Sequence, residues 1–149
     1  NLLGSARRMI REARAADIPA VVRCLGRLQA ELGLALPFHT VSAANTVRRL
    51  AISDRGLVLV LDLGSIEGCM LAGAQPYAFA EVLQAAEIAW WIDPEFRGHW
   101  GQTMLAAYEA WADRLGAKMI AVSHTGKSAD ALYSRRGFAR AETTYFKVT

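Results

Sequence analysis

Residues 89–105 form the most informative segment of the chain and read Ala89-Trp90-Trp91-Ile92-Asp93-Pro94-Glu95-Phe96-Arg97-Gly98-His99-Trp100-Gly101-Gln102-Thr103-Met104-Leu105. The pattern predicts a strand, a short turn with two glycines, and an amphipathic helix that begins directly after the turn. Glycine lets the backbone approach a ligand closely, and a helix N-terminus presents unpaired N–H groups and a positive dipole end. Such a turn suits a pyrophosphate, although a plain connection explains it equally well.

The rest of the chain predicts a mixed α/β fold in the order β-α-α-β-β-β-α-β-α-β. Asp17 and Ser42 are the expected N-caps of the first two helices. Residues 9–149 are expected to form a single domain, with residues 1–8 as an N-terminal extension outside it. The strands are predicted at 9–13, 57–61, 66–75, 86–92, 118–123 and 141–148, and the helices at 17–33, 42–50, 102–115 and 128–135.

Composition excludes several classes of protein. The 149 residues are 53% hydrophobic and 21% charged, which is typical of a globular domain rather than a disordered tail. No apolar run approaches the roughly 20 residues needed to span a bilayer, and the N-terminus lacks the apolar stretch of a secretory signal. Cys24 and Cys69 stand outside any cysteine or histidine cluster, so we expect no metal site and a reducing, cytoplasmic location. The net charge of +3 suits a protein that binds an anionic ligand and is also common in proteins that bind none.

A second motif lies downstream of the glycine turn, at Ala129-x-x-Leu132-Tyr133-x-x-x-Gly137-Phe138. It is similar to the later A-x-x-L-Y-x-x-x-G-F signature of the GNAT superfamily of acyl-CoA N-acyltransferases. The turn itself, Arg97-Gly98-His99-Trp100-Gly101-Gln102, resembles the acetyl-CoA motif of that family, Q/R-x-x-G-x-G/A, and the preceding D-P-E-F-R-G resembles its usual lead-in. Both motifs stand at the expected separation, so the chain is identified as a small GNAT-type protein similar to bacterial and phage-like members.

The resemblance implies a cofactor site for acetyl-CoA. Splayed neighbouring strands would expose the backbone of Trp91 and Ile92 to the pantetheine arm. Two family glycines are replaced by Trp100 and Gln102, but backbone N–H groups do not depend on the side chain, so binding persists if the shape of the turn does. Ser128 would supply a hydroxyl to the cofactor, or simply cap its helix. The remaining expected contacts are Arg97, Gly98, His99, Gly101 and Thr103.

The resemblance also implies direct attack of an amine on the thioester, without a covalent enzyme intermediate. Tyr133 matches the family tyrosine that protonates the leaving thiolate, and the alternative is a core aromatic beside Phe138. Glu87 lies where some members place a general-base glutamate, and a solvated residue at the start of a strand is equally compatible. The other candidate bases are His39, His99 and His124.

The sequence therefore favours an N-acetyltransferase that acts on a primary amine of a small molecule or peptide. The alternative is a GNAT-fold module that binds acyl-CoA or a partner protein without turnover. A nucleic-acid-binding domain ranks last, because the arginines are dispersed and no zinc, RNP or helix-turn-helix pattern is present. We expect no membrane partner, and a homodimer is one expectation from the family. The loop at 34–40, with Tyr77 and Phe79, is expected to shape the acceptor pocket.

Overall fold

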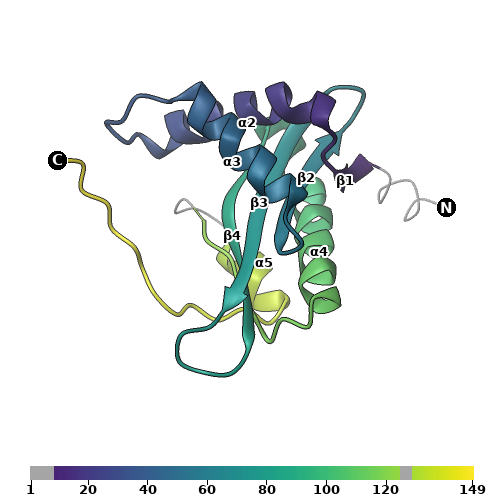
Figure 1. Cartoon of the computed structure of the whole chain (residues 1–149), viewed down its shortest axis with the longest axis vertical. Helices are drawn as coiled ribbons and strands as arrows, with labels where there is room; N and C mark the ends of the chain where they lie inside the picture. The colour runs from purple at the N-terminus through teal and green to yellow at the C-terminus, as the bar shows by residue number, and fades with distance from the viewer. Residues whose placement is uncertain (1–8, 125–128) are drawn as a thin grey trace.

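The computed structural model describes residues 9–124 and 129–149, and within them a mixed sheet of five strands follows the order of the chain (Figure 1). The first four strands pair antiparallel, and the fifth runs parallel to the fourth because a helix crosses between them. The predicted mixed α/β fold is confirmed. The strands are β1 (Ile10–Glu12), β2 (Gly56–Asp62), β3 (Ile66–Pro76), β4 (Leu83–Ile92) and β5 (Met119–Ala121).

Helices cover both faces of the sheet, and this explains the continuous apolar run in β2. Val58 and Val60 pack under two helices on one face, whereas Leu57, Leu59 and Leu61 pack under the long helix on the other. Among the described residues, no helix has the length and apolar character needed to cross a membrane. The first face carries α2 (Ile18–Leu32) and α3 (Thr40–Ile52), the second carries α4 (His99–Arg114) and α5 (Asp130–Arg135), and the short 3₁₀ turns are η1 (Ala15–Asp17) and η2 (Pro94–Phe96).

The prediction of a final strand at 141–148 is wrong for this structure. Residues 139–149 run as extended chain that pairs with no strand among the described residues, and they leave the body of the molecule (Figure 1). The side chains of Tyr145 and Phe146 are 89% and 75% exposed. Strand propensity describes how well side chains fit a pleated, half-buried surface, so it predicts a segment able to pair but does not supply its partner.

Two helix starts differ in detail from the prediction. Asp17 does precede α2, but its carboxylate makes no cap hydrogen bond and is used elsewhere. His39, rather than Ser42, caps α3, because its Nδ1 accepts the backbone N–H of Ser42 at 3.1 Å. The end of α2 is as expected: Gly33 has φ of 65°, a left-handed conformation that glycine adopts without strain.

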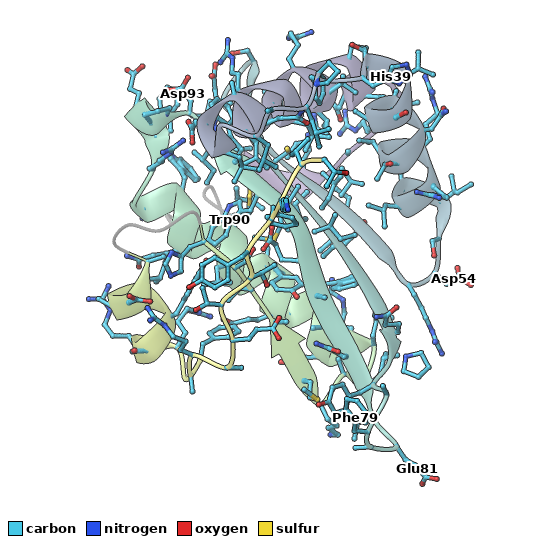
Figure 2. The ribbon with its side chains drawn as sticks, turned by 90° about the vertical axis from the view of Figure 1, so that its left-hand side faces the viewer. His39, Asp54, Phe79, Glu81, Trp90 and Asp93 are labelled. Carbon is cyan, nitrogen blue, oxygen red and sulfur yellow. The ribbon has the colours of Figure 1, made fainter. Side chains whose placement is uncertain are left out.

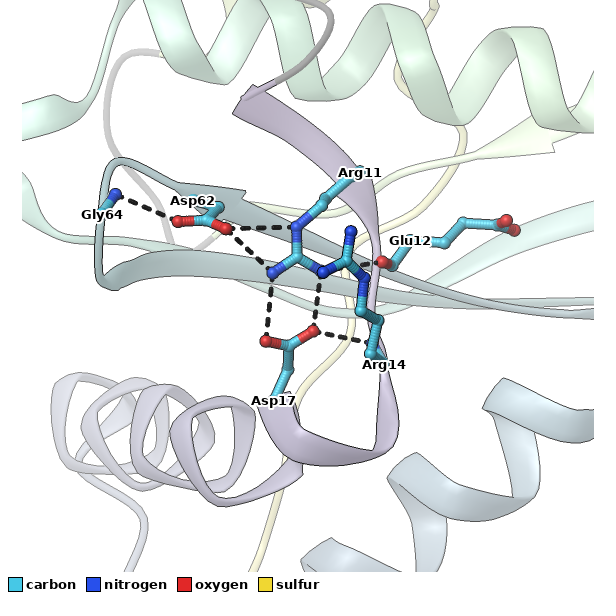
Figure 3. Close-up of polar contacts among 6 residues, drawn as sticks. All are labelled: Arg11, Glu12, Arg14, Asp17, Asp62 and Gly64. Atoms are coloured by element: carbon cyan, nitrogen blue, oxygen red, sulfur yellow. Dashed lines mark hydrogen bonds and ion pairs between the residues drawn. The ribbon is translucent and has the colours of Figure 1, made fainter.

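A guanidinium group ties β1 to two other parts of the fold (Figure 3). Arg11 donates to the two carboxylate oxygens of Asp17 at 2.7 and 3.1 Å, and to Asp62 Oδ2 at 2.9 and 3.2 Å. Asp62 also accepts the N–H of Gly64 in the turn between β2 and β3, at 3.0 Å. The hydrogen bonds from Arg11 lower the pKa of both carboxyl groups. The charge cluster therefore joins β1, the end of β2 and the start of α2.

We expect Arg11→Met to lower the free energy of unfolding at pH 7 by about 1–3 kcal/mol, toward the lower end because the groups are partly exposed. The carboxyl pKa values are lowered in the folded state, so their contribution is present above the unfolded pKa near 3.8 and is lost as pH falls through the folded values. Urea titrations at pH 7 and pH 2.5 should thus show a variant deficit that shrinks in acid. Arg23→Met, which removes an exposed charge from α2, is the control, and an equal loss in both variants would contradict the prediction.

Candidate active site

The turn into α4 presents backbone donors rather than side chains. Gly98 is the N-cap and has φ of 88° and ψ of −103°, a conformation that side chains disfavour. The N–H of Gln102 makes the first helical hydrogen bond, to the carbonyl of Gly98 at 3.0 Å. The N–H groups of His99, Trp100 and Gly101 precede that bond and lie at the positive end of the helix dipole. The helix begins three residues earlier than predicted, so three donors, and not the whole hexapeptide, are available to an anion.

Arg97, expected beside the phosphates, is held at the entrance of this turn. Its Nε donates to the carbonyl of Ile92 at 2.7 Å, and its Nη2 donates to Glu31 Oε1 at 2.8 Å. The same carboxylate oxygen accepts the indole N–H of Trp91 at 2.9 Å. Burial raises the pKa of Glu31, but these two hydrogen bonds bring it below its usual value. Glu31 thereby links α2 to the end of β4, and no local motif could have identified it, because it stands 66 residues from Arg97.

The parallel pairing of β4 and β5 is short and ends beside a polar group. The last paired residues are Ala86 and Ala121. One residue further on, the carboxylate of Glu87 accepts both the N–H and the hydroxyl of Ser123, at 3.0 and 2.8 Å. Ile88 then forms a bulge in β4, since the β3 register shifts by one residue there. A bulge bends and twists its strand, so β4 turns away from the chain that continues β5.

Two tyrosines donate their hydroxyls at the point where the strands part. Tyr108 donates to the carbonyl of Ala121 at 2.8 Å, and Tyr133 donates to the carbonyl of Ser123 at 2.7 Å. Both rings are buried, and burial raises the pKa of both phenols. They therefore stay neutral donors at physiological pH. Burial also raises the pKa of the half-buried Glu87, against the opposing effect of its hydrogen bonds from Ser123. Of this group, only Glu87 and Tyr133 were predicted as site residues, and Tyr108 was not.

The ring of Trp90 lies between the glycine turn and the hydrogen-bonded group of Glu87, Ser123 and Tyr133. Its ring centroid is 6.5 Å from that of Tyr133, and its Cζ2 would lie 3.8 Å from a Cβ at Gly101. Trp91 points to the opposite face and is buried against α2, as the strand alternation predicts. Figure 2 shows Trp90 beside β4 on the side of the sheet that carries α4 and α5. Going back along β4 from the donors of the turn, one thus meets Trp90 and then the hydrogen-bonded pair of Glu87 and Ser123, where β4 and β5 separate.

The structure places the other predicted residues in different roles. Gln102 is exposed, and the hydroxyl of Thr103 donates to the carbonyl of His99 inside the helix at 3.0 Å. His124 Nε2 lies 3.2 Å from Asp130 Oδ1. Ser128 lies outside the described residues. Within the described ranges, no group of three His, Cys, Asp or Glu residues could hold a metal ion.

The residues expected to shape an acceptor pocket do not come together. His39 caps α3, at the end of the 34–40 loop. Tyr77 and Phe79 form an edge-to-face pair with ring centroids 5.6 Å apart at the tip between β3 and β4. Figure 2 shows Phe79 and Asp93, which precedes the glycine turn, at opposite ends of the molecule. The prediction for Phe79 therefore places an acceptor contact far from the turn.

Comparison with known proteins identifies the family. A model of the acetyltransferase (GNAT) family matches residues 34–138, which include the turn, the strand separation and Tyr133. The chain belongs to the GNAT family of acetyltransferases. A comparison with curated protein sequences finds no match.

Solved structures share this fold at low sequence identity. An integron cassette protein from the mobile metagenome of Cole Harbour Salt Marsh is 21% identical with a TM-score of 0.77, over 95% of this chain and 90% of that one. A GNAT family acetyltransferase of Staphylococcus aureus is 20% identical with a TM-score of 0.67, over 94% and 97%. The aminoglycoside 6'-N-acetyltransferase AAC(6')-IG of Acinetobacter haemolyticus is 14% identical with a TM-score of 0.71, also over 94% and 97%. These structures establish the fold, and family membership supports acyl transfer as the general class of reaction.

The half-buried carboxylate of Glu87 gives a test of the site that needs no substrate. The pKa of Glu87 is raised in the folded state, so the wild type loses stability as pH rises from the unfolded pKa near 4.5 through the folded value. Glu87→Gln keeps an oxygen that can accept from Ser123 but does not titrate. We expect the two proteins to be nearly equal in stability at pH 4, and the variant to be more stable at pH 7. Urea titrations across this range measure the difference in the free energy of unfolding, and exposed Glu81→Gln is the matched control. A flat profile for Glu87→Gln would contradict the burial of this charge.

Proposed function

We propose that this protein transfers an acetyl group from acetyl-CoA to a primary amine. The observation that carries the proposal is that the pairing of β4 and β5 ends at Ala86 and Ala121, and that the Glu87 carboxylate and the neutral phenol of Tyr133 both hydrogen-bond Ser123 just beyond that point. Donors for an anion stand at one end of β4, Glu87 stands further back along the same strand, and Tyr133 reaches Ser123 from α5. This is the arrangement that a long molecule with a phosphate end and a reactive end requires.

The residues present fit the cofactor. The pyrophosphate would bind the N–H groups of His99, Trp100 and Gly101, because unpaired donors and the helix dipole favour negative charge there. Trp91 and Ile92 would flank the pantetheine arm through their backbone. The carbonyl of Ile92 already accepts from Arg97, so we assign Arg97 to positioning this strand end rather than to the phosphates.

Acetyl-CoA would supply an activated acyl carbon and a thiol leaving group. Glu87 would accept a proton from the acceptor ammonium, directly or through water, and its raised pKa makes it a better base than an exposed carboxylate. The amine nitrogen then bonds to the acyl carbon while the carbon–sulfur bond breaks with its electron pair on sulfur. Tyr133 would turn its O–H from the carbonyl of Ser123 to that sulfur and donate the proton. The nitrogen would then release its second proton, which restores the Tyr133 phenol through water, so that the products are an amide, free CoA and the one proton accepted by Glu87.

The acceptor is proposed only as a class, a primary amine on a small molecule or peptide, and the cytoplasm is the expected compartment. A panel of such amines with acetyl-CoA, read by release of free thiol, tests the reaction directly. The competing function is an acyl-CoA-binding module without turnover. It is favoured by Trp100 and Gln102 at family glycine positions and by the existing bond from Tyr133 to Ser123. Tight CoA binding with no thiol release from any amine would support the module.

The cofactor turn is tested by a matched pair of variants at Gly101. A Cβ there meets only Trp90 at 3.8 Å, an ordinary contact, so Gly101→Ala should bind CoA normally. Gly101→Pro removes the N–H in the first helical turn, where proline is tolerated by the fold. Loss of one charge-assisted hydrogen bond, about 1.5–3 kcal/mol, should raise the Kd for CoA about 10- to 100-fold. Calorimetry measures both affinities, and equal Kd values in two folded variants would place the phosphates elsewhere.

Tyr133→Phe should affect turnover more than cofactor affinity. Its hydroxyl would act on charge that develops on sulfur only as the thioester breaks, so removing it lowers kcat and leaves ground-state binding nearly intact. Loss of a general acid typically costs on the order of 10²–10⁴ in rate. The measurement is kcat with an active amine beside the Kd for CoA. A fall in kcat of less than about threefold, far short of that range, would make Tyr133 a structural residue.

A further inference from the structure

The carboxylate of Glu31, on α2, holds two side chains from the end of β4 and the start of the glycine turn. Its Oε1 accepts the indole N–H of Trp91 at 2.9 Å and Nη2 of Arg97 at 2.8 Å. Arg97 is bound a second time, because its Nε donates to the carbonyl of Ile92 at 2.7 Å. The next residue, Gly98, is the N-cap of α4. Glu31 therefore fixes the chain directly before the N–H groups that are proposed to bind the pyrophosphate.

Two arginines and two carboxylates lie around the ring of Trp91, and their charges cancel in pairs. The guanidinium carbons of Arg27 and Arg97 are 5.5 and 6.0 Å from the ring centroid. Arg97 pairs with Glu31, and Nη1 of Arg27 lies 3.7 Å from Oδ2 of Asp93. A phosphate at the turn therefore gains little from the charge of either arginine. Its binding would depend on the backbone N–H groups and the helix dipole, and hence on how well the turn keeps its shape.

The ion pair between Glu31 and Arg97 is exposed, and an exposed ion pair by itself stabilises a fold very little. Much of the usual cost of such a pair is the conformational entropy lost when two long side chains are held in one geometry. Here other bonds already hold both partners. Trp91 is only 5% exposed, and its indole N–H needs an acceptor, which Glu31 supplies. The carbonyl of Ile92 holds Arg97. The pair can therefore order the turn although it lies at the surface.

We propose that Glu31 is a positioning residue for the cofactor turn. It holds Arg97 against the end of β4, so that the turn from Gly98 to Gly101 keeps one conformation before the cofactor arrives. Glu31 itself touches no part of the cofactor. A site that adopts its binding conformation for only a fraction of the time binds its ligand more weakly by that fraction. The proposal rests on the proposed function, because CoA is taken to bind this turn, but the ordering of the turn is measurable without CoA.

The first measurement uses the protein without cofactor and follows the indole N–H resonances of its four tryptophans by NMR. Glu31→Ala should move the resonance of Trp91, which loses its acceptor, and that of Trp100, which lies in the first turn of α4. Trp111 stacks on Tyr108 further along α4, and its resonance should stay in place. Glu31→Gln keeps an oxygen acceptor without the charge, so it should move both resonances less, and it gives the readout if the alanine variant does not fold. An unmoved Trp100 resonance would overturn the proposal.

The second measurement is the Kd for CoA by calorimetry. Glu31→Ala should raise the Kd about three- to tenfold, because the turn then spends less time in its binding conformation. Arg97→Met should raise it by a similar factor. The double variant should bind no more weakly than either single variant, because both substitutions remove the same anchor and their effects do not add. Exposed Arg23→Met on α2 and exposed Glu81→Gln should keep the wild-type Kd.

A direct contact between Arg97 and the phosphates gives the opposite sign. Glu31→Ala would then release Arg97 toward the anion and lower the Kd, and Arg97→Met would still raise the Kd in the Glu31→Ala background. Either result, or a Kd that Glu31→Ala leaves unchanged, would overturn the proposal. If the wild type binds no CoA at all, the proposed function fails, and the Trp100 resonance still decides whether Glu31 orders the turn.

Discussion

The carboxylate of Glu87, bound to the backbone N–H and hydroxyl of Ser123, is the interaction on which the candidate site depends. When the ladder between two parallel strands stops, the backbone N–H groups beyond it lose their strand partner. Here a side chain from β4 supplies that partner one residue after the last pair, Ala86 and Ala121. The bulge at Ile88 then bends β4 away. The strands can part without leaving the N–H of Ser123 unpaired, and the same carboxylate is left half-buried with a raised pKa.

Two tyrosines, one before β5 in the sequence and one after it, also hydrogen-bond the chain where the strands part. Tyr108 reaches the gap from α4, which precedes β5, and Tyr133 reaches it from α5, which follows β5. Each donates to a carbonyl on the chain of β5 or just beyond it, so backbone acceptors freed by the parting strands are also satisfied. The atoms that make these hydrogen bonds are therefore the ones to which the chemistry is proposed. To donate to a substrate, Tyr133 would first have to break its hydrogen bond to the carbonyl of Ser123. Its net contribution to the reaction would then be the difference in free energy between the new hydrogen bond and the one it broke.

Much of this could be predicted from sequence because the signals are local. The alternation in residues 57–61 and at Trp90 and Trp91 follows from the strand period, and the two motifs fix the family. Glu31 and Tyr108 could not be found in this way. Glu31 meets Arg97 only because α2 crosses the end of β4, and Tyr108 has the spacing of a core residue and differs from one by a single hydroxyl. The prediction of a last strand at 141–148 failed for a related reason: strand propensity is a local property of the sequence, whereas the partner strand is not local.

The strands that carry the candidate site differ in how well they are paired. β2 and β3 are covered on both faces and paired on both edges, whereas β5 has only three residues and one paired neighbour among the described strands. Local opening costs least where burial and pairing are least, so the β5 edge should open at a lower free-energy cost than β2 or β3. Ser123 and Tyr133 both belong to that side, while Glu87 belongs to the well-paired β4. The site is therefore formed by a well-paired strand that carries Glu87 and by a less well-paired part of the fold that carries Ser123 and Tyr133. Contacts that order the chain after β5 should act mainly on Tyr133, the proposed acid.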